Sequence, residues 1–215
     1  MNKHQHSLLK WPLLLITLAL GSVALGTGIS AVGKSAFKVA KQTNEKSIRR
    51  QWANEEPFEI LEYRAKGKTV PEDRSGKAFK VEGGEKWLQG LTLRIKNKSE
   101  KAIVYIRITL VFPEALVDGK KITYDYDIGH GVQAKVKRGD PILLIKGEST
   151  TWEFTEKYSN TLDRFMQKCG YRLDDLTKVD IYIQEVHFAD NTMWFVGEFY
   201  VPDPDNPGGW RMIPR

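Results

Sequence analysis

The 215-residue chain has a formal net charge of +6, but residues 51–215 hold 25 basic and 26 acidic side chains. The positive excess therefore belongs to residues 1–50, and the body lacks the basic face expected of a nucleic-acid-binding domain. Cys169 is the only cysteine, which excludes an intrachain disulfide and a cysteine-rich metal site.

The first 33 residues have the layout of an export signal. Residues 1–10 are polar and basic, residues 13–25 are almost continuously apolar, and small residues follow as far as Gly33. The alternative is one membrane-spanning helix over residues 11–32, because about 20 apolar residues cross a bilayer. Residues 1–33 are therefore predicted to be a signal peptide or a helical membrane anchor. The protein is expected in the bacterial cell envelope, either anchored in the inner membrane and facing the periplasm or secreted after cleavage.

Residues 34–55 are predicted to be a basic juxtamembrane spacer. Six Lys and Arg follow the apolar run, and only Lys3 and Lys10 precede it. By the positive-inside rule, this balance would leave the body of an uncleaved protein in the cytoplasm, whereas the order of basic, apolar and small segments is typical of bacterial export. The spacer is interpreted either as a basic helix on anionic lipid headgroups or as a solvated linker.

Residues 56–201 form a succession of short strand patterns with turn signals between them. Alternation of apolar and polar residues buries one face of a strand and exposes the other. The charge- and glycine-rich residues 66–84 are expected to be a long loop or an irregular edge. The main predicted strands are 57–64, 91–96, 104–112, 120–128, 150–156, 179–188 and 192–201.

The strands at 91–96 and 104–112 are the centre of this prediction. In each of them every second residue is apolar, and the connection between them begins with Asn97-Lys98-Ser99-Glu100. Such residues favour turns. The two strands are therefore predicted to pair as a central hairpin, and a second hairpin is predicted for 179–188 and 192–201.

One short helix interrupts the strand pattern. Asn160 is placed to cap its start, and Gly170 suits the left-handed conformation at its end. The apolar stripe consists of Leu162, Phe165, Met166 and Cys169. The predicted fold class is all-β: an immunoglobulin-like β-sandwich with one short helix, preceded by the N-terminal signal or transmembrane helix. Residues 202–215 are predicted to be a Pro- and Asp-rich tail, because its prolines cannot donate to a ladder.

Two segments carry a resemblance to known proteins. The segment LTLRIKNKSEKAIVYIRITLVFPE resembles the core of the FxLYD-type immunoglobulin-like modules of bacterial envelope proteins, in which a polar turn joins two strands. The sequence departs from that family in having Phe112-Pro113-Glu114 at the position of the family's aromatic-acidic end. The closing segment VHFADNTMWFVGEFYVPDPDNPGGW is similar to the ends of membrane-anchored or secreted bacterial proteins. The resemblance implies a fold and a location, and no activity.

The tightest group of polar candidates is Asp125, Asp127 and His130. The two aspartates share a strand face, with carboxylates roughly 7 Å apart by strand geometry, which suits paired acid-base chemistry on a glycan or partial cation ligation. The alternative is the wet face of a half-buried strand. Trp194 is the fourth candidate, as one of several aromatics that form either a sugar or peptide platform or part of the core.

Cys169 and His187 are the remaining pair with potential chemistry, as a nucleophile and a base. Cys169 lies on the apolar stripe of the predicted helix, where a thiol behaves as a small hydrophobe. His187 lies between Val186 and Phe188 on a strand. Both are interpreted as packing residues.

These patterns predict a non-catalytic binding or structural module of the envelope, with no catalytic residue, cofactor or metal. Its expected partners are the membrane, through the N-terminal helix, and another envelope protein or a glycan, and nucleic acid is not among them. The alternative is a carbohydrate-binding or glycan-cleaving domain that uses Asp125 and Asp127 with surface aromatics. Speculative ligand contacts are assigned to Asp125, Asp127, His130 and Trp194.

Overall fold

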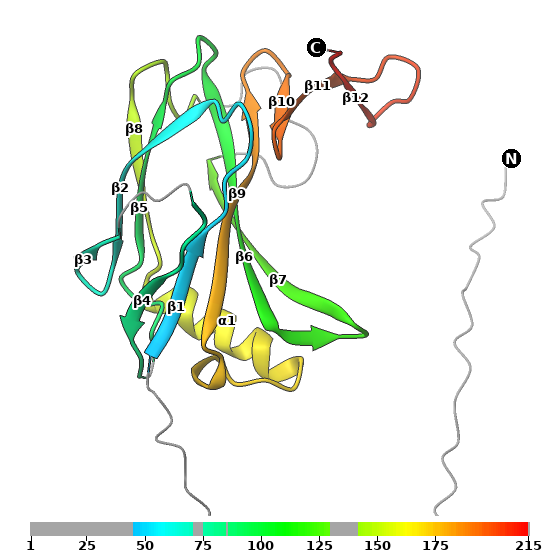
Figure 1. The fold of residues 1–215 in the computed structure, drawn as a ribbon. Coiled ribbons are helices and arrows are strands. Elements are labelled where there is room, and N and C mark those ends of the chain that lie inside the picture. Colours follow the sequence, from blue (N-terminus) through cyan, green and yellow to red (C-terminus); the bar gives the residue numbers. More distant parts are fainter. Residues whose placement is uncertain (1–44, 71–74, 85, 130–141, 215) are drawn as a thin grey trace, which may run out of the picture. The chain divides into compact units, whose positions relative to one another are not determined.

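The computed structural model describes residues 45–70, 75–84, 86–129 and 142–214. They belong to one compact unit, Gln42–Arg215, which is mostly β-strand with one short α-helix (Figure 1). The predicted signal or anchor, residues 1–33, and His130 lie outside the described residues. Within the described ranges, no helix combines the length and the apolar character needed to cross a bilayer.

The strands form two sheets that face each other as in a sandwich, as the alternation predicted. The large sheet contains β1 (Glu45–Arg50), β4 (Phe79–Glu82), β6 (Ile103–Val117), β7 (Lys120–Gly129), β9 (Lys178–Phe188), β10 (Met193–Phe195), β11 (Glu198–Pro202) and β12 (Trp210–Met212). The small sheet contains β2 (Phe58–Ala65), β3 (Lys68–Thr69), β5 (Thr92–Asn97) and β8 (Ser149–Glu153). Helix α1 (Glu156–Lys168) and a 3-10 turn at Leu173–Asp175 connect β8 to β9.

Strand β9 is the centre of the large sheet. Strand β6 pairs with it antiparallel along one side. On its other side, β1 pairs parallel with the first half of β9 and β10 pairs antiparallel with the second half. Among the described strands, β7 pairs only with β6 and β4 only with β1, so these two are edges.

The core lies between the sheets and is closed at one end by α1. Alternate residues of β6, from Ile106 to Phe112, are fully buried. The ring centroid of Tyr126 lies 4.9 Å from that of Tyr158 on α1, and 5.7 Å from that of Trp152 on β8. Trp152 is buried, and the strand pattern predicted for 120–128 is confirmed.

The predicted central hairpin is wrong. Strand β5 lies in the small sheet between β2 and β8, whereas β6 lies in the large sheet between β7 and β9. Both strands present their apolar faces to the same core from opposite sides. Alternation identifies each strand and its buried face, but it is the same for two strands that pair and for two that face each other across a sandwich.

Asn97 shapes the connection between the two sheets. Its side chain is 0% exposed, and its Nδ2 donates to the carbonyl oxygens of Lys101 at 2.8 Å and Leu144 at 3.2 Å. Its Oδ1 accepts from the N–H of Ser99 at 2.9 Å. These bonds turn the chain out of the small sheet and join it to the segment before β8.

Strand β1 lies inside the predicted spacer, so the sandwich begins at Glu45 rather than at residue 56. Its alternate positions Lys46, Ile48 and Arg50 are buried. Two of these three are cations, and hydrophobic periodicity therefore gives no strand signal. The Nζ of Lys46 donates to the carbonyl oxygens of Asp174 at 2.5 Å and Leu176 at 3.0 Å.

The second buried cation of β1 is part of an ion pair. A guanidinium nitrogen of Arg50 lies 2.8 Å from the carboxylate of Glu56, and the guanidinium stacks 3.4 Å from the ring centroid of Trp52. Both charged side chains are largely buried, at 6% and 9% exposure. Burial of these charges is tolerable because each is paired.

Two further elements differ in detail from the prediction. Helix α1 begins at Glu156 after the N-cap Thr155, so Asn160 lies within the helix and is not its cap. Gly170 has a φ of +85°, as expected after a helix. The strand predicted at 192–201 is broken at Val196 and Gly197, which have φ values of 45° and 101°. The chain turns back there, and β11 pairs with β10.

The predicted tail also contains a strand. Strand β12 pairs antiparallel with β11 after the proline-rich turn. The ring of Trp210 packs against that of His187, with centroids 5.5 Å apart. The tail is thus part of the large sheet.

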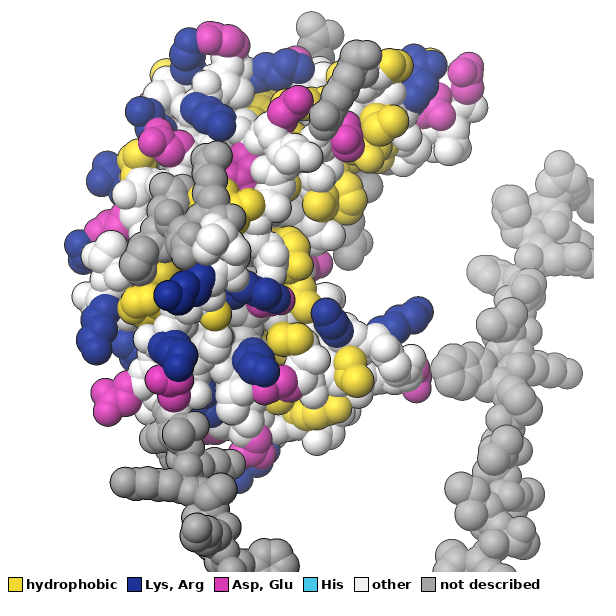
Figure 2. All heavy atoms as spheres, viewed as in Figure 1, with side chains coloured by type: hydrophobic (Ala, Val, Ile, Leu, Met, Phe, Trp, Pro, Cys, Tyr) yellow, Lys and Arg dark blue, Asp and Glu magenta, His cyan; other side chains and the backbone are white. Residues whose placement is uncertain are grey.

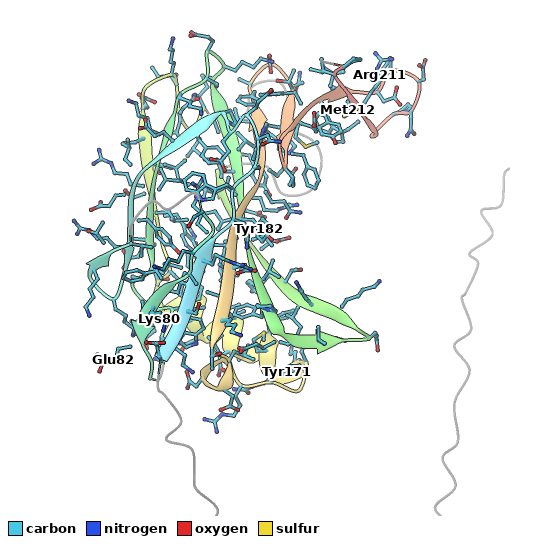
Figure 3. All side chains as sticks on the ribbon, viewed as in Figure 1. Lys80, Glu82, Tyr171, Tyr182, Arg211 and Met212 are labelled. Atoms are coloured by element: carbon cyan, nitrogen blue, oxygen red, sulfur yellow. The ribbon has the colours of Figure 1, made fainter. Side chains whose placement is uncertain are left out.

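The far end of the β6–β7 hairpin projects from the sandwich (Figure 1, Figure 2). Its turn contains Asp118 and Gly119, both at positive φ. Tyr171 lies beside this end of the hairpin (Figure 3). Its hydroxyl donates to the carbonyl oxygen of Leu116 and accepts from the N–H of the same residue, both at 3.0 Å. The projecting end is therefore held by the body.

Glu114 ties the hairpin to the start of β9. Its carboxylate accepts hydrogen bonds from the Thr177 N–H and hydroxyl, both at 2.6 Å, and from the Lys178 N–H at 3.1 Å. Partial burial alone would raise the pKa of Glu114, but the hydrogen bonds from Thr177 outweigh it, and the pKa is lowered. The ionised form is thus favoured in the folded protein.

Replacing Glu114 by glutamine is expected to lower the free energy of unfolding by about 1–2 kcal/mol at pH 7. Because the folded-state pKa lies below the unfolded one, the stabilisation is complete above the unfolded value of about 4.3 and is lost as pH falls through the folded value. Urea unfolding of both proteins between pH 7 and pH 3 measures this. The control is Glu153→Gln, an exposed position on β8. A difference that does not change with pH would contradict the assignment.

Candidate functional site

A network of charged side chains lies on the outer face of the large sheet, on three neighbouring strands. In the ladder registers, Arg107 of β6 is opposite Asp127 of β7 on one side and Glu185 of β9 on the other. Thr109, two residues further along β6, is opposite Asp125. Sheet pairing therefore places residues from distant parts of the sequence on one surface.

Arg107 is the centre of the network. Its Nε lies 3.2 Å from Asp127 and 4.0 Å from Asp125, and its Nη1 donates to Glu185 at 2.9 Å. Burial alone would lower the pKa of Arg107, but the charge of Glu185 and the hydrogen bond to Asp127 raise it. Three carboxylates thus share one guanidinium, and the cluster has an excess of negative charge.

Hydroxyl groups hold the two aspartates from the side of β6. The Tyr105 hydroxyl donates to Asp127 at 2.5 Å, and the Thr109 hydroxyl lies 2.7 Å from Asp125. Burial, and then the hydrogen bond to Asp127, raise the pKa of Tyr105. Tyr105 is therefore a neutral donor at physiological pH, and both carboxylates are fixed in position.

His187 extends the network toward the C-terminal strands. Its Nε2 forms a hydrogen bond with Glu185, and its ring lies edge-on to Tyr105, with centroids 5.2 Å apart. Trp210 covers it on the β12 side. The residue is 4% exposed, and its Nδ1 has no hydrogen-bond partner within the described residues. It packs as the sequence predicted, but against polar groups rather than in the apolar core.

Of the four residues to which ligand contacts were assigned, the structure keeps Asp125 and Asp127 together and places Trp194 in the core. Asp125 and Asp127 share the outer face of β7, with side chains 46% and 32% exposed, so their predicted placement on the wet face is confirmed. His130 lies outside the described residues. Trp194 is 0% exposed and packs edge-on against Phe58 in the core. Its ring is therefore not part of an aromatic surface beside the aspartates.

The geometry of the two aspartates limits their chemistry. Both carboxylates interact with the same guanidinium and with a hydroxyl from β6. Within the described ranges, no group of three or more His, Cys, Asp or Glu side chains is arranged to hold a metal ion. Asp125 and Asp127 are thus members of one charged network that is anchored on β6.

Sequence reasoning missed four members of the network: Tyr105, Thr109, Glu185 and, as its centre, Arg107. Each lies at a position of its strand that alternation assigns to the outer face or leaves ambiguous. Only the pairing of β6 with both β7 and β9 brings them together. The available signal was the arginine among apolar residues of β6, which requires a carboxylate partner when partly buried.

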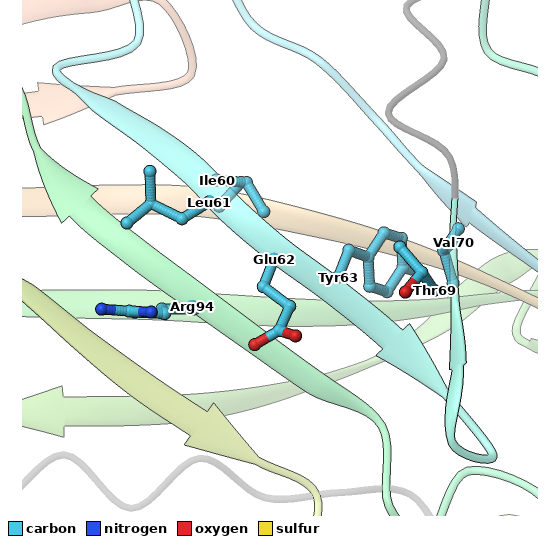
Figure 4. A pocket seen from close by; sticks show the side chains of 7 residues that line it. All are labelled: Ile60, Leu61, Glu62, Tyr63, Thr69, Val70 and Arg94. Carbon is cyan, nitrogen blue, oxygen red and sulfur yellow. The ribbon is translucent and has the colours of Figure 1, made fainter.

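A separate hollow of about 400 Å³ lies beside the bulge of β2 on the other sheet (Figure 4). Its lining combines Ile60, Leu61, Glu62, Tyr63, Thr69, Val70 and Arg94. Tyr63 is buried, its hydroxyl has no hydrogen-bond partner within the described residues, and burial raises its pKa. The hollow lies outside the charged network and contains none of the predicted site residues.

Comparison with known proteins identifies no relative of the chain. No family model, curated protein or solved structure matches it. The functional assignment therefore depends on the geometry described above.

Proposed function

We propose that the protein is a non-catalytic binding module with an immunoglobulin-like sandwich, located in the bacterial envelope, that binds a partner protein by adding a strand to β7. The observation that carries this proposal is the free side of β7. Ten residues, Lys120–Gly129, pair along one side with β6 and with no other described strand. An unpaired edge of this length offers a row of N–H and C=O groups to a partner strand.

The charged network supports this use of β7. Asp125 and Asp127 project from the strand and are held by Arg107, Thr109 and Tyr105 of the neighbouring strand. Side chains that are fixed before binding lose little conformational entropy when a partner contacts them. The strand is therefore a preorganised surface with a defined charge pattern.

The same network disfavours a glycan-cleaving site. Both aspartates are engaged by Arg107 and by a hydroxyl of β6. Trp152 and Trp194 are buried in the core, so they form no aromatic platform for a sugar beside the two carboxylates. Location in the envelope is supported by the basic, apolar and small-residue order of residues 1–33.

Site-specific photo-crosslinking in bacterial cells tests this proposal on the full-length chain. A benzophenone amino acid in place of the exposed Thr123 on β7 is expected to give a discrete crosslinked product. The same substitution at the exposed Thr151, on the β8 edge of the small sheet, is the matched control. Absence of a product from position 123, or equal products from both positions, would contradict binding at β7.

A further inference from the structure

We infer that the partner of β7 is a second copy of this chain, whose β7 pairs antiparallel with the first across a two-fold axis at Tyr124. This inference rests on the proposed function, because it uses the same free edge. Antiparallel pairing of identical strands closes into a dimer, since each copy uses the same surface. The charge pattern of β7 carries the inference.

Lys121, Asp125 and Asp127 lie on the outer face of β7, with lysine toward the hairpin turn and the aspartates toward the other end. A two-fold axis at Tyr124 places Lys121 of each copy directly opposite Asp127 of the partner, and Thr123 opposite Asp125. Opposite charges at directly facing positions stabilise a strand pair, and like charges destabilise it. The strand is therefore complementary to itself in this register.

Three other arrangements are less favourable. An axis at Asp125 would place the two Asp125 carboxylates directly opposite each other, and parallel pairing would align Lys121 with Lys121. A shift by one residue would bring the polar face of one copy against the apolar face of the other. The axis at Tyr124 pairs Lys120–Ile128 of one copy with the same residues of the other.

The inner face agrees with this register. There Tyr124 of one copy would face Tyr124 of the other, and Ile122 would face Tyr126. Tyr124 is half-buried and packs against Phe165 of α1, with ring centroids 5.0 Å apart. Cross-strand aromatic and aliphatic pairs of this kind stabilise a sheet. The apolar layer between the large sheet and α1 would thus continue from one copy into the next.

Two charge variants of the full-length chain test the inference. Lys121→Glu places a carboxylate opposite Asp127 of the partner at two equivalent positions, and it is expected to raise the dimer dissociation constant about tenfold. Lys120→Glu makes the same change in net charge at the adjacent exposed residue, which faces Ile128 in this register, and it is expected to change the constant less than about twofold. Fluorescence energy transfer between two differently labelled copies, titrated by dilution, measures both.

The result of the Thr123 crosslinking distinguishes this inference from the proposed function. A product with the mass of two chains supports both, and a product with a different protein overturns the inference alone. No product overturns both. Equal effects of the two charge variants, or a chain that is monomeric at all concentrations, would also overturn the inference.

Discussion

Replacing Arg107 with methionine is expected to lower the free energy of unfolding by about 2 kcal/mol near pH 7. The substitution keeps the unbranched stem but removes the guanidinium among Asp125, Asp127 and Glu185. These carboxylates then repel one another on a surface where the arginine is 23% exposed. Solvent screening limits the loss to less than that of a fully buried ion pair. Urea unfolding followed by tryptophan fluorescence measures the difference.

Arg94→Met is the matched control for this variant. Arg94 lies on the exposed face of β5 and donates to the Ser149 hydroxyl at 3.3 Å. Its replacement is expected to change the free energy of unfolding by less than about 0.5 kcal/mol. Equal small effects for both variants would mean that solvent, and not Arg107, offsets the repulsion among the three carboxylates. The proposal that β7 is a preorganised surface would then be wrong.

Replacing Asn97 with alanine is expected to lower the free energy of unfolding by about 3 kcal/mol. The residue is 0% exposed. Its side-chain amide forms hydrogen bonds with the carbonyl oxygens of Lys101 and Leu144 and with the N–H of Ser99, and these hydrogen bonds join the two sheets. The variant loses these bonds and leaves a small cavity. Asn97→Asp has almost the same size but turns a carboxylate oxygen toward two carbonyl oxygens, so an equal or larger loss is expected at neutral pH.

Asn160→Ala controls for asparagine removal in general. Asn160 is exposed within α1, where alanine is the better helix former. The variant is expected to be neutral or slightly more stable. If Asn160→Ala lowered the free energy of unfolding as much as Asn97→Ala, the role of Asn97 in the connection between the two sheets would be contradicted. The start of α1 at Glu156 would be contradicted as well.

The individual strands were largely predictable from the sequence, whereas their pairing was not. Alternation located β2, β5, β6, β7 and β9, because in each of them one face is apolar and the other polar. It could not decide whether β5 and β6 pair or face each other. The hydrogen bonds of Asn97 determine that the chain passes from one sheet to the other. An asparagine, however, is as favourable in a tight hairpin turn as in such a connection between sheets.

The first strand was missed for a different reason. Of its three buried positions, Lys46 and Arg50 are charged, and each is satisfied by residues distant in sequence or after the next turn. A buried cation gives no hydrophobic signal until its partners are known. The same limitation applies to Arg107, because its carboxylates come from two other strands.

The candidate site was predictable only in part. The exposed face of Asp125 and Asp127 followed from the alternation in β7. Trp194 is buried in β10, where the pairing with β9 places it opposite the buried Val186. The sequence does not fix this register, so it does not show which of the neighbouring rings enter the core.

The parallel pairing of β1 with β9 determines when the large sheet can be completed during translation. Arg49 bonds to Asp180, and the two are 131 residues apart in the sequence. Strand β1 therefore emerges from the ribosome early, whereas β9 emerges only when most of the chain has been translated. Contacts of such separation form slowly. In nascent chains that end before Lys178, β1 has no β9 with which to pair. The sandwich can therefore be completed only late in synthesis.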